Sequence, residues 1–336
     1  MRVINSVQYL RGFAAISVLL FHLGERFGVP FNVGSAGVDV FFVISGFIMW
    51  VTTAGKLWTP QQFMMRRIIR IVPLYWIVIG VTAVATLLKP QFLYGSDLST
   101  YNFFGSLLFV PEVKNDAFHP VVLQGWTLTY EMFFYSVFAI GLLIVEKWRF
   151  WLLTIVFGLL FLLQPFIPAV HLRTLANPII VEFLLGVALA QLWVSGRPIP
   201  LWAAASMLFM GLMLFASVGD LAPSLPRLFR WGGPAVMVVG GSVFIERAWT
   251  MKRVSILGLL GDASYSIYLW HVVTAALIDG LLLKLKLPLM FHAVSVGALT
   301  LASTVTLYLL IEKPIIQFFA GTIDHPLQAR SAKPAH

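Results

Sequence analysis

The segment Gln8-Tyr-Leu-Arg11-Gly-Phe-Ala-Ala-Ile-Ser-Val-Leu-Leu-Phe-His22 combines an apolar run with two ionisable side chains. On an α-helix, with a rise of about 1.5 Å per residue, eleven positions bring Arg11 and His22 to nearly the same face, about 16 Å apart along the axis. Ionisable groups are costly inside a membrane. We therefore expect both side chains to face a protein interior or a wet cavity and to have a function there. The alternative is that Arg11 extends to the cytoplasmic surface and His22 lies in the opposite headgroup layer.

The composition is typical of a multi-pass membrane protein. Of 336 residues, 59% are hydrophobic and only 11% are charged, which is far more apolar than a soluble domain of this length requires. About 20 apolar residues are needed to cross roughly 30 Å of hydrocarbon. Runs of suitable length lie near residues 6–24, 36–54, 71–88, 124–145, 150–167, 178–195, 200–218, 231–246, 264–283 and 288–311. We therefore predict an all-α integral membrane protein with about ten transmembrane helices.

The distribution of lysine and arginine predicts the orientation. If the amino terminus lies inside, the inner loops and ends receive more of these residues than the outer loops, so the positive-inside rule places both termini in the cytoplasm. The net charge of +9 then reflects topology rather than nucleic-acid binding, because no soluble basic face exists to carry such a ligand. The first apolar run is too long for a cleavable signal peptide and is expected to remain as an anchor.

No internal repeat is evident, and we expect one membrane domain at residues 1–319 followed by a flexible cytoplasmic tail at residues 320–336. The longest predicted extramembrane stretch is residues 89–123. Its apolar run at residues 103–110 is too short to span, so it is expected to be re-entrant or to lie flat as a lid. The absence of cysteine excludes disulfides, thiolate metal sites and an acyl-cysteine intermediate.

The sequence Thr59-Pro60-Gln61-Gln62 has the arrangement of a helix start, with a hydroxyl cap, proline at the first helical position and glutamine three residues after the cap. It predicts a short interfacial helix between the second and third spans, ending before Pro73. That helix would carry Arg66, Arg67 and Arg70. These arginines are either a positive-inside anchor or a phosphate clamp, since guanidinium groups bind phosphate oxygens in pairs.

The second predicted span contains a carboxylate near its outer end and small residues one helical turn deeper. Asp39 is expected at a depth similar to that of His22, so it could orient the imidazole. Ser45 and Gly46 are typical of close helix packing. Ser45 is also a candidate nucleophile.

Two later spans contribute further candidates. Glu131 shares a helix face with Tyr135 and is expected either at the site or in a structural ion pair with Arg11. The ninth span contains Tyr268 and places His271 near the middle of the membrane, where it is either a satisfied core histidine or part of the site.

Five stretches, in this order, resemble those of the membrane family often called acyltransferase-3, and most closely its exopolysaccharide O-acetyltransferase (ExoZ-type) branch. They are Leu10-Arg11-Gly12-Phe13-Ala14 through Phe21-His22, Gly37 to Phe47, Arg66-Arg67-Ile68-Ile69-Arg70, Gly125-Trp126-Thr127-Leu128 with Glu131, and Ser264 to His271. Together they cover nearly the full length of the chain.

The resemblance implies an integral membrane enzyme of the bacterial inner membrane that moves an acyl group to a carbohydrate hydroxyl. The implied donor is acetyl-coenzyme A or another acyl-coenzyme A, with no metal. The implied partners are the lipid bilayer, the donor and the carbohydrate acceptor, and the oligomeric state is left open, a homo-oligomer included. Some relatives carry an added extracytoplasmic hydrolase-like domain, for which this chain is expected to be too short.

In the family pattern, the arginine and histidine of the first helix and the paired arginines of the R-x-x-R motif are functional, which implies roles for Arg11, His22, Arg67 and Arg70. We expect the arginines to bind the phosphates of coenzyme A from the cytoplasm. The thioester end of the donor would then extend between helices to His22.

His22 is expected to act as general base on the sugar hydroxyl, with Asp39 or Glu131 orienting its imidazole. An acyl-enzyme on His22, or on Ser45, is the competing scheme. A proton-coupled transporter or flippase would use the same residue types within a membrane. The chain lacks the related halves and paired broken helices that many carriers show, which favours the enzyme.

Overall fold

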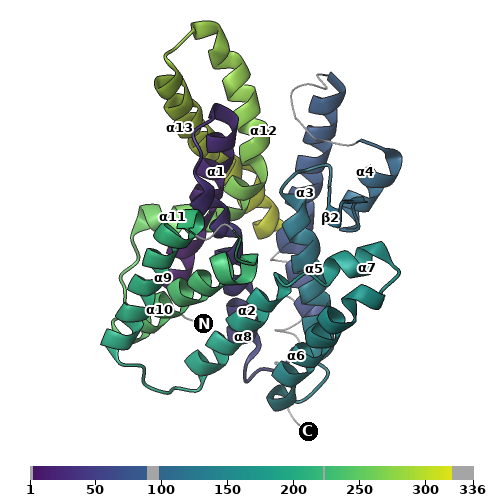
Figure 1. Ribbon diagram of the computed structural model, residues 1–336, viewed down its shortest axis with the longest axis vertical. Coiled ribbons are helices and arrows are strands. Elements are labelled where there is room, and N and C mark those ends of the chain that lie inside the picture. The colour runs from purple at the N-terminus through teal and green to yellow at the C-terminus, as the bar shows by residue number, and fades with distance from the viewer. Residues whose placement is uncertain (1–2, 89–97, 222–223, 320–336) are drawn as a thin grey trace.

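The computed structural model describes residues 3–88, 98–221 and 224–319, and these ranges are almost entirely helical (Figure 1). The α-helices are α1 (Asn5–Phe27), α2 (Gly37–Thr53), α3 (Pro60–Leu88), α4 (Thr100–Leu107), α5 (Gly125–Gly141), α6 (Glu146–Leu163), α7 (Val170–Leu175), α8 (Ile180–Val194), α9 (Leu201–Leu221), α10 (Gly233–Ala248), α11 (Ser255–Asp262), α12 (Ser264–Leu282) and α13 (Leu289–Leu307). Short 3-10 or π turns, η1 to η5, occupy Asn32–Ala36, Gln164–Phe166, Leu228–Gly232, Leu283–Leu285 and Tyr308–Glu312. A two-stranded hairpin pairs β1 (Val113–Lys114) with β2 (Ala117–Phe118).

The prediction of an all-α membrane protein is confirmed. Within the described residues, seven helical segments are long and apolar enough to cross a bilayer, and they contain α1, α2, α3, α6, α10, α12 and α13. The other predicted spans correspond to α5, α8 and α9. Helices α5 and α8 have only 17 and 15 residues, fewer than the roughly 20 that a perpendicular crossing needs. The count of ten spans and the cytoplasmic termini therefore stay predictions.

Helix α3 differs from the expected arrangement. It begins as predicted, because the Gln62 backbone N–H donates to Thr59 Oγ1 at 3.2 Å and the Thr59 N–H donates to Gln62 Oε1 at 3.2 Å. It then continues without a break for 29 residues, with Pro73 inside it. The prediction of a separate interfacial helix is therefore wrong. Proline removes one backbone donor, but buried Leu74 and Tyr75 pack the helix beyond Pro73 into the bundle and maintain its direction.

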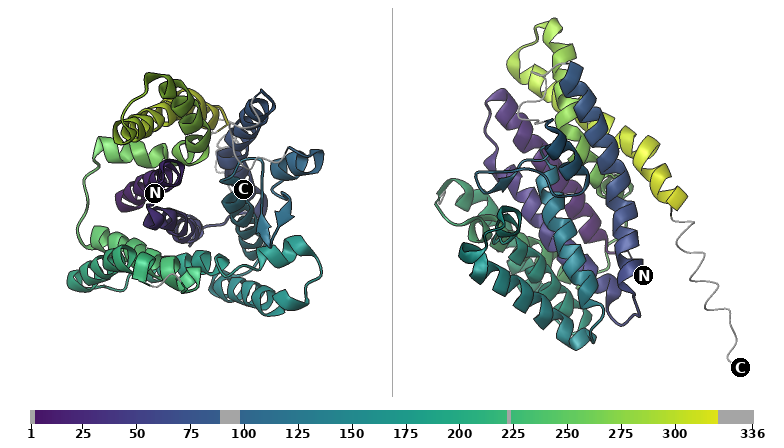
Figure 2. Two further views of the ribbon diagram at one scale, coloured as in Figure 1. Left: turned by 45° about the horizontal axis from the view of Figure 1, so that its top comes forward. Right: turned by 90° about the vertical axis from the view of Figure 1, so that its right-hand side faces the viewer.

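Helices α1 and α2 occupy the middle of the bundle, as the left view of Figure 2 shows. Helix α1 contacts α2, α10, α11, α12 and α13, whereas α2 contacts α5, α8 and α10. Helix α3 lies on the remaining side, where it packs against α5 and α12. Residues of α1 and α2 can therefore meet side chains from nearly every other part of the bundle.

The close packing of α2 on α8 depends on two glycines. A Cβ atom added at Gly46 would overlap the carbonyl oxygen of Phe183, and one added at Gly186 would overlap that of Val43. The two backbones thus approach more closely than any side chain allows. The interpretation of Gly46 as a packing residue is confirmed.

The predicted apolar run at residues 103–110 overlaps the short helix α4. Its buried Asn102 receives the N–H of Glu112 at 2.9 Å and donates to the carbonyl of His119 at 2.9 Å. Trp76 of α3 donates to the carbonyl of Leu107 at 2.9 Å, so α4 is folded against its own loop and α3. The expected role of this run as a re-entrant segment or a lid stays a prediction. Residues 89–97 of the same stretch, and the predicted tail at residues 320–336, lie outside the described residues.

We predict that Gly46→Ala lowers the thermal stability of the detergent-purified protein. The added methyl group has no space against the Phe183 backbone, and overpacking of this kind costs about 1–3 kcal/mol. The matched control is Gly158→Ala in α6, where an added Cβ meets nothing within 4 Å. Equal unfolding midpoints for the two variants would contradict the close α2–α8 contact.

Candidate active site

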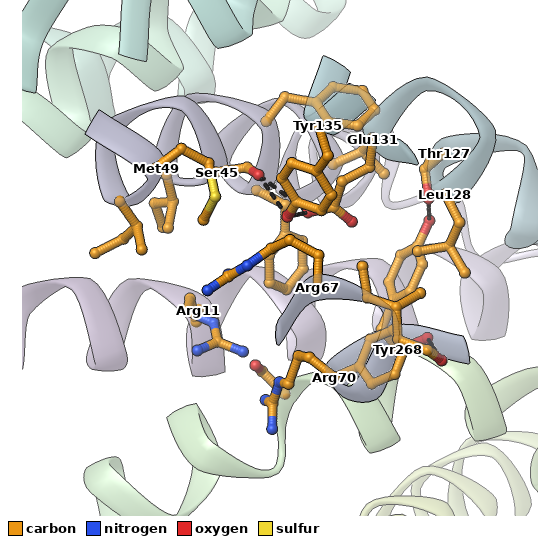
Figure 3. Close-up of a pocket in the computed structure, with 18 residues that line it drawn as sticks. Arg11, Ser45, Met49, Arg67, Arg70, Thr127, Leu128, Glu131, Tyr135 and Tyr268 are labelled. Carbon is orange, nitrogen blue, oxygen red and sulfur yellow. Dashed lines mark hydrogen bonds between the residues drawn. The ribbon is translucent and has the colours of Figure 1, made fainter. Parts of the chain in front are cut away.

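A cavity of about 150 Å³ lies between α1, α2, α3, α5 and α12 (Figure 3). We call it the arginine cavity, because three guanidinium groups line it. The predicted residues that line it are Arg11, Ser45, Arg67, Arg70, Glu131 and Tyr268. The structure thus brings together side chains from five helices that the sequence showed only as separate motifs.

The arginine cavity carries an excess of positive charge. Arg70 forms an ion pair with Glu312, 3.0 Å from Nη1 to Oε1, and the Glu312 side chain is only 1% exposed. Arg67 makes no hydrogen bond within the described residues, and its guanidinium lies 5.7 Å from the Phe63 ring centroid. Within the described residues the only hydrogen bond of Arg11 is a long one, 3.4 Å to Gln8, and Glu312 and Glu131 attract its charge without forming an ion pair. Guanidinium groups without carboxylate partners suit an anionic ligand.

Arg66 does not line this cavity. Its guanidinium carbon lies 4.8 Å from the ring centroid of Trp58, a residue that precedes α3. Of the three arginines at the start of α3, Arg67 and Arg70 therefore face the cavity, as their spacing predicted.

Glu131 is held by two hydroxyl groups. Ser45 Oγ donates to Glu131 Oε1 at 3.0 Å, and the Tyr135 hydroxyl makes a short hydrogen bond to the same oxygen. Within the described residues no ion pair joins Glu131 to Arg11. The expectations that Glu131 orients His22 or pairs with Arg11 are therefore wrong in this structure, because Glu131 is turned toward α2. Ser45 is more than a packing residue, since its hydroxyl belongs to this cluster.

A second cavity of about 340 Å³ contains His22, and we call it the histidine cavity. Its other lining residues are Val18, Phe21, Asn32, Ser35, Val38, Leu123, Gln124, Trp126, Arg227, Arg230, Trp231 and Tyr268. Val38 and Tyr268 line both cavities. The two cavities are therefore neighbours. Arg11, Arg67 and Arg70 line one of them, and His22 lines the other together with Arg227 and Arg230.

Tyr268 is fixed at the junction between the cavities. Its hydroxyl lies 2.9 Å from Thr127 Oγ1 and 3.4 Å from the carbonyl oxygen of Gln124. Its ring packs edge-on against Phe41. Figure 3 shows the hydrogen bond between Thr127 and Tyr268 at one side of the arginine cavity.

Asp39 does not orient His22, contrary to expectation. Its carboxylate, which is fully buried, forms a two-point contact with Arg227: Nε to Oδ1 at 3.1 Å and Nη2 to Oδ2 at 2.6 Å. The Glu182 carboxyl group is also buried, and neither of its oxygens has a hydrogen-bond partner within the described residues. The cation that pairs with Asp39 thus comes from the turn before η3.

Sequence reasoning missed Arg227 and Glu182. Glu182 lies inside the predicted span 178–195, so its position as an intramembrane carboxylate was a usable signal. Arg227 lies between the predicted spans 200–218 and 231–246, and no local pattern links it to Asp39. Its side chain reaches Asp39 because the π turn η3 follows it directly and leads into α10.

His22 contacts His271 instead of a carboxylate. His22 Nδ1 lies 2.9 Å from the carbonyl oxygen of Val18 and 3.1 Å from His271 Nε2. His271 Nδ1 lies 2.8 Å from the carbonyl oxygen of Tyr268, and the residue is only 1% exposed. His271 is therefore satisfied within the core, as one reading of the sequence held, and it is also a direct neighbour of His22.

Comparison with known proteins gives a family match over most of the chain. A family model described as an acyltransferase domain, of acyltransferase-3 type, matches residues 4–310. The exopolysaccharide production protein ExoZ of Rhizobium meliloti is 39% identical over 312 residues, which cover 89% of this chain and 95% of that protein.

Two further relatives are more distant. The putative membrane-bound transacylase BcsY of Komagataeibacter xylinus is 28% identical over 290 residues, 80% of this chain and 72% of that protein. The peptidoglycan O-acetyltransferase OatA of Listeria monocytogenes is 27% identical over 369 residues, 96% of this chain but only 58% of that protein. The chain thus spans little more than half the length of OatA. No solved structure matches the chain.

We predict that Arg227→Met destabilises the protein strongly, by about 3–5 kcal/mol, because it leaves the buried Asp39 carboxylate without its cation. The matched control is Arg173→Met, which breaks a 3.0 Å pair with Asp116, whose side chain is 72% exposed. Exposed pairs contribute about 0–1 kcal/mol. Unfolding midpoints in detergent would measure both, and a loss no larger for Arg227→Met than for Arg173→Met would refute the assignment.

Proposed function

Because the chain belongs to the acyltransferase-3 family of acyltransferase domains, we propose that it moves an acetyl group from acetyl-coenzyme A to a carbohydrate hydroxyl within the membrane. The acceptor that we propose is an exopolysaccharide repeat or another lipid-linked oligosaccharide. The names of two relatives, an exopolysaccharide production protein and a peptidoglycan O-acetyltransferase, support a polysaccharide acceptor. The observation that carries the proposal is the contact between the arginine cavity and the histidine cavity at Tyr268.

The arginine cavity is the proposed donor site. Coenzyme A carries phosphates at one end and the thioester at the other. Arg67 and Arg70, with Arg11, would bind the phosphates through charge-assisted hydrogen bonds. The pantetheine arm would pass Tyr268 and bring the thioester to His22, which lies about 16 Å farther along α1 than Arg11.

The histidine cavity is the proposed acceptor site. It combines the aromatic side chains of Trp126 and Trp231 with the polar groups of Asn32 and Gln124. Its lining also includes Arg227 and Arg230, so the cavity offers both aromatic rings and hydrogen-bonding groups to a sugar. One sugar ring in this cavity would present a hydroxyl group to the half-buried imidazole of His22.

In the proposed reaction, His22 Nε2 removes the hydroxyl proton as the sugar oxygen attacks the thioester carbonyl. The new C–O bond forms and the C–S bond breaks. The departing thiolate then takes the proton from the imidazolium, which restores neutral His22. An acyl-enzyme on His22 or Ser45 would instead leave labelled protein after rapid mixing with radiolabelled acetyl-coenzyme A alone.

We also propose that the arginine cavity opens to the cytoplasm, where coenzyme A is available. The positive-inside distribution supports this orientation in the bacterial inner membrane, with both termini cytoplasmic. The acceptor would then reach His22 from the opposite half of the bilayer.

We predict that the double variant Arg67→Ala/Arg70→Ala weakens acetyl-coenzyme A binding about a hundredfold or more, since hydrogen bonds to charged groups contribute about 1.5–3 kcal/mol each. Isothermal titration of the purified protein would measure it. The control is Lys147→Ala/Arg197→Ala, which removes two exposed cations outside the cavity. Unchanged affinity in the Arg67/Arg70 variant would show that these residues do not bind acetyl-coenzyme A.

We predict that His22→Ala lowers kcat for acetyl transfer about 10²–10⁴-fold, the usual contribution of a general base, while acetyl-coenzyme A still binds. His119→Ala, which changes an exposed histidine, should retain full activity. The assay is transfer of radiolabelled acetyl groups to a lipid-linked oligosaccharide. Near-normal turnover by His22→Ala would exclude the proposed base.

A further inference from the structure

We propose that His271 is a positioning residue that holds His22 in the tautomer with its basic nitrogen, Nε2, available to the acceptor hydroxyl. This inference deepens the proposed function and rests on it for the identity of the reaction. The hydrogen-bond geometry that carries it is independent of the reaction.

The backbone of α12 determines which nitrogen of His271 carries hydrogen. His271 Nδ1 lies 2.8 Å from the carbonyl oxygen of Tyr268 and 3.1 Å from that of Ile267. A nitrogen lone pair at these distances would repel the oxygen lone pairs, so Nδ1 must donate. In a neutral imidazole the other nitrogen then bears the lone pair. His271 Nε2 is therefore an acceptor, directed at His22.

The same reasoning determines the tautomer of His22. Its Nδ1 lies 2.9 Å from the carbonyl oxygen of Val18 and 3.1 Å from His271 Nε2, and both of these atoms are acceptors. A hydrogen on His22 Nδ1 satisfies both contacts as a shared bond. The opposite tautomer would place three lone pairs against one another. His22 Nε2 consequently keeps its lone pair, as a general base requires.

The surroundings of His22 Nε2 agree with that role. Within the described residues Nε2 has no hydrogen-bond partner, and the His22 side chain lines the histidine cavity. His271 is only 1% exposed and lines neither cavity. His271 thus acts on the reaction only through His22, in the place where many hydrolytic enzymes use a carboxylate. When His22 accepts the proton, the Nδ1–H bond to His271 becomes charge-assisted and stronger.

Three variants of His271 separate positioning from simple packing. In His271→Gln, the side-chain carbonyl oxygen can occupy the position of Nε2 and accept the same hydrogen. In His271→Asn, the shorter amide ends near the position of Nδ1 and cannot reach His22. His271→Leu fills the space without an acceptor. We expect the Gln variant to keep most of its kcat, and the Asn and Leu variants to lose about 10- to 100-fold.

The KM for acetyl-coenzyme A should not change in any of the three variants, because His271 does not line the arginine cavity. In a His22→Ala background, His271→Leu should cause no further loss of the residual rate, since the two residues act as one unit. Equal losses for the Gln and Asn variants, or an additive loss in the double variant, would overturn the proposal.

A spectroscopic measurement tests the tautomer without any activity. Protein with ¹⁵N-labelled histidine rings should show His22 with a protonated Nδ1 and an unprotonated Nε2, identified by the signals lost in His22→Ala. His271→Gln should retain this pattern and His271→Leu should shift it. A protonated Nε2 in the neutral wild-type protein would refute the inference even if transfer is active. The expected tautomer in a protein that transfers nothing would instead refute the proposed function alone.

Discussion

The constraint on which this structure depends is the cost of an ionisable group inside a membrane. Each such group must be paired or must face a wet cavity. Asp39 is paired with Arg227, and Glu312 with Arg70. A third cluster joins Asp279 to Arg26 at 2.5 Å and to His292 at 2.7 Å, away from both cavities. Arg67 and His22 are different, because within the described residues neither forms an ion pair and each lines a cavity.

The location of these two groups follows from the central position of α1 and α2. Helix α1 carries a cation at one depth and an imidazole about 16 Å farther along, and it is surrounded by α10 to α13. Helix α2 packs tightly on α8, and its residues line both cavities. The result is two adjoining cavities, and that arrangement suits a donor that is long, anionic at one end and reactive at the other. The acceptor then needs only to place one hydroxyl group in the histidine cavity.

The sequence predicted the properties that depend on one helix at a time. Apolar runs predicted most helices, the Thr59–Gln62 pattern predicted the start of α3, and the spacing of Arg67 and Arg70 predicted their common face. Contacts between helices could not be predicted in this way, because hydrophobic periodicity does not give the rotation of one helix against another. For this reason the sequence suggested His22 as the partner of Asp39, whereas in the structure the partner is Arg227. His22 and Arg227 both line the histidine cavity, near the start of α2.

The same limit applies to the site. The sequence left Glu131 either to orient His22 or to pair with Arg11, whereas the structure turns it toward Ser45 and Tyr135. His271 lies 249 positions from His22, and no local pattern joins the two. The unbroken passage of α3 through Pro73 was also unpredictable from local rules, which usually end a helix before proline. Burial of the residues beyond Pro73 decided the outcome.

The most direct test of the two-cavity account is a structure of the protein bound to a non-transferable acetyl-coenzyme A analogue with a methylene group in place of the thioester sulfur. The account predicts phosphate oxygens within hydrogen-bond distance of Arg67 and Arg70, an arm that passes Tyr268, and an acetyl carbonyl next to His22 Nε2. An analogue that binds with its phosphates outside the arginine cavity, or with its acetyl group directed away from His22, would contradict the account.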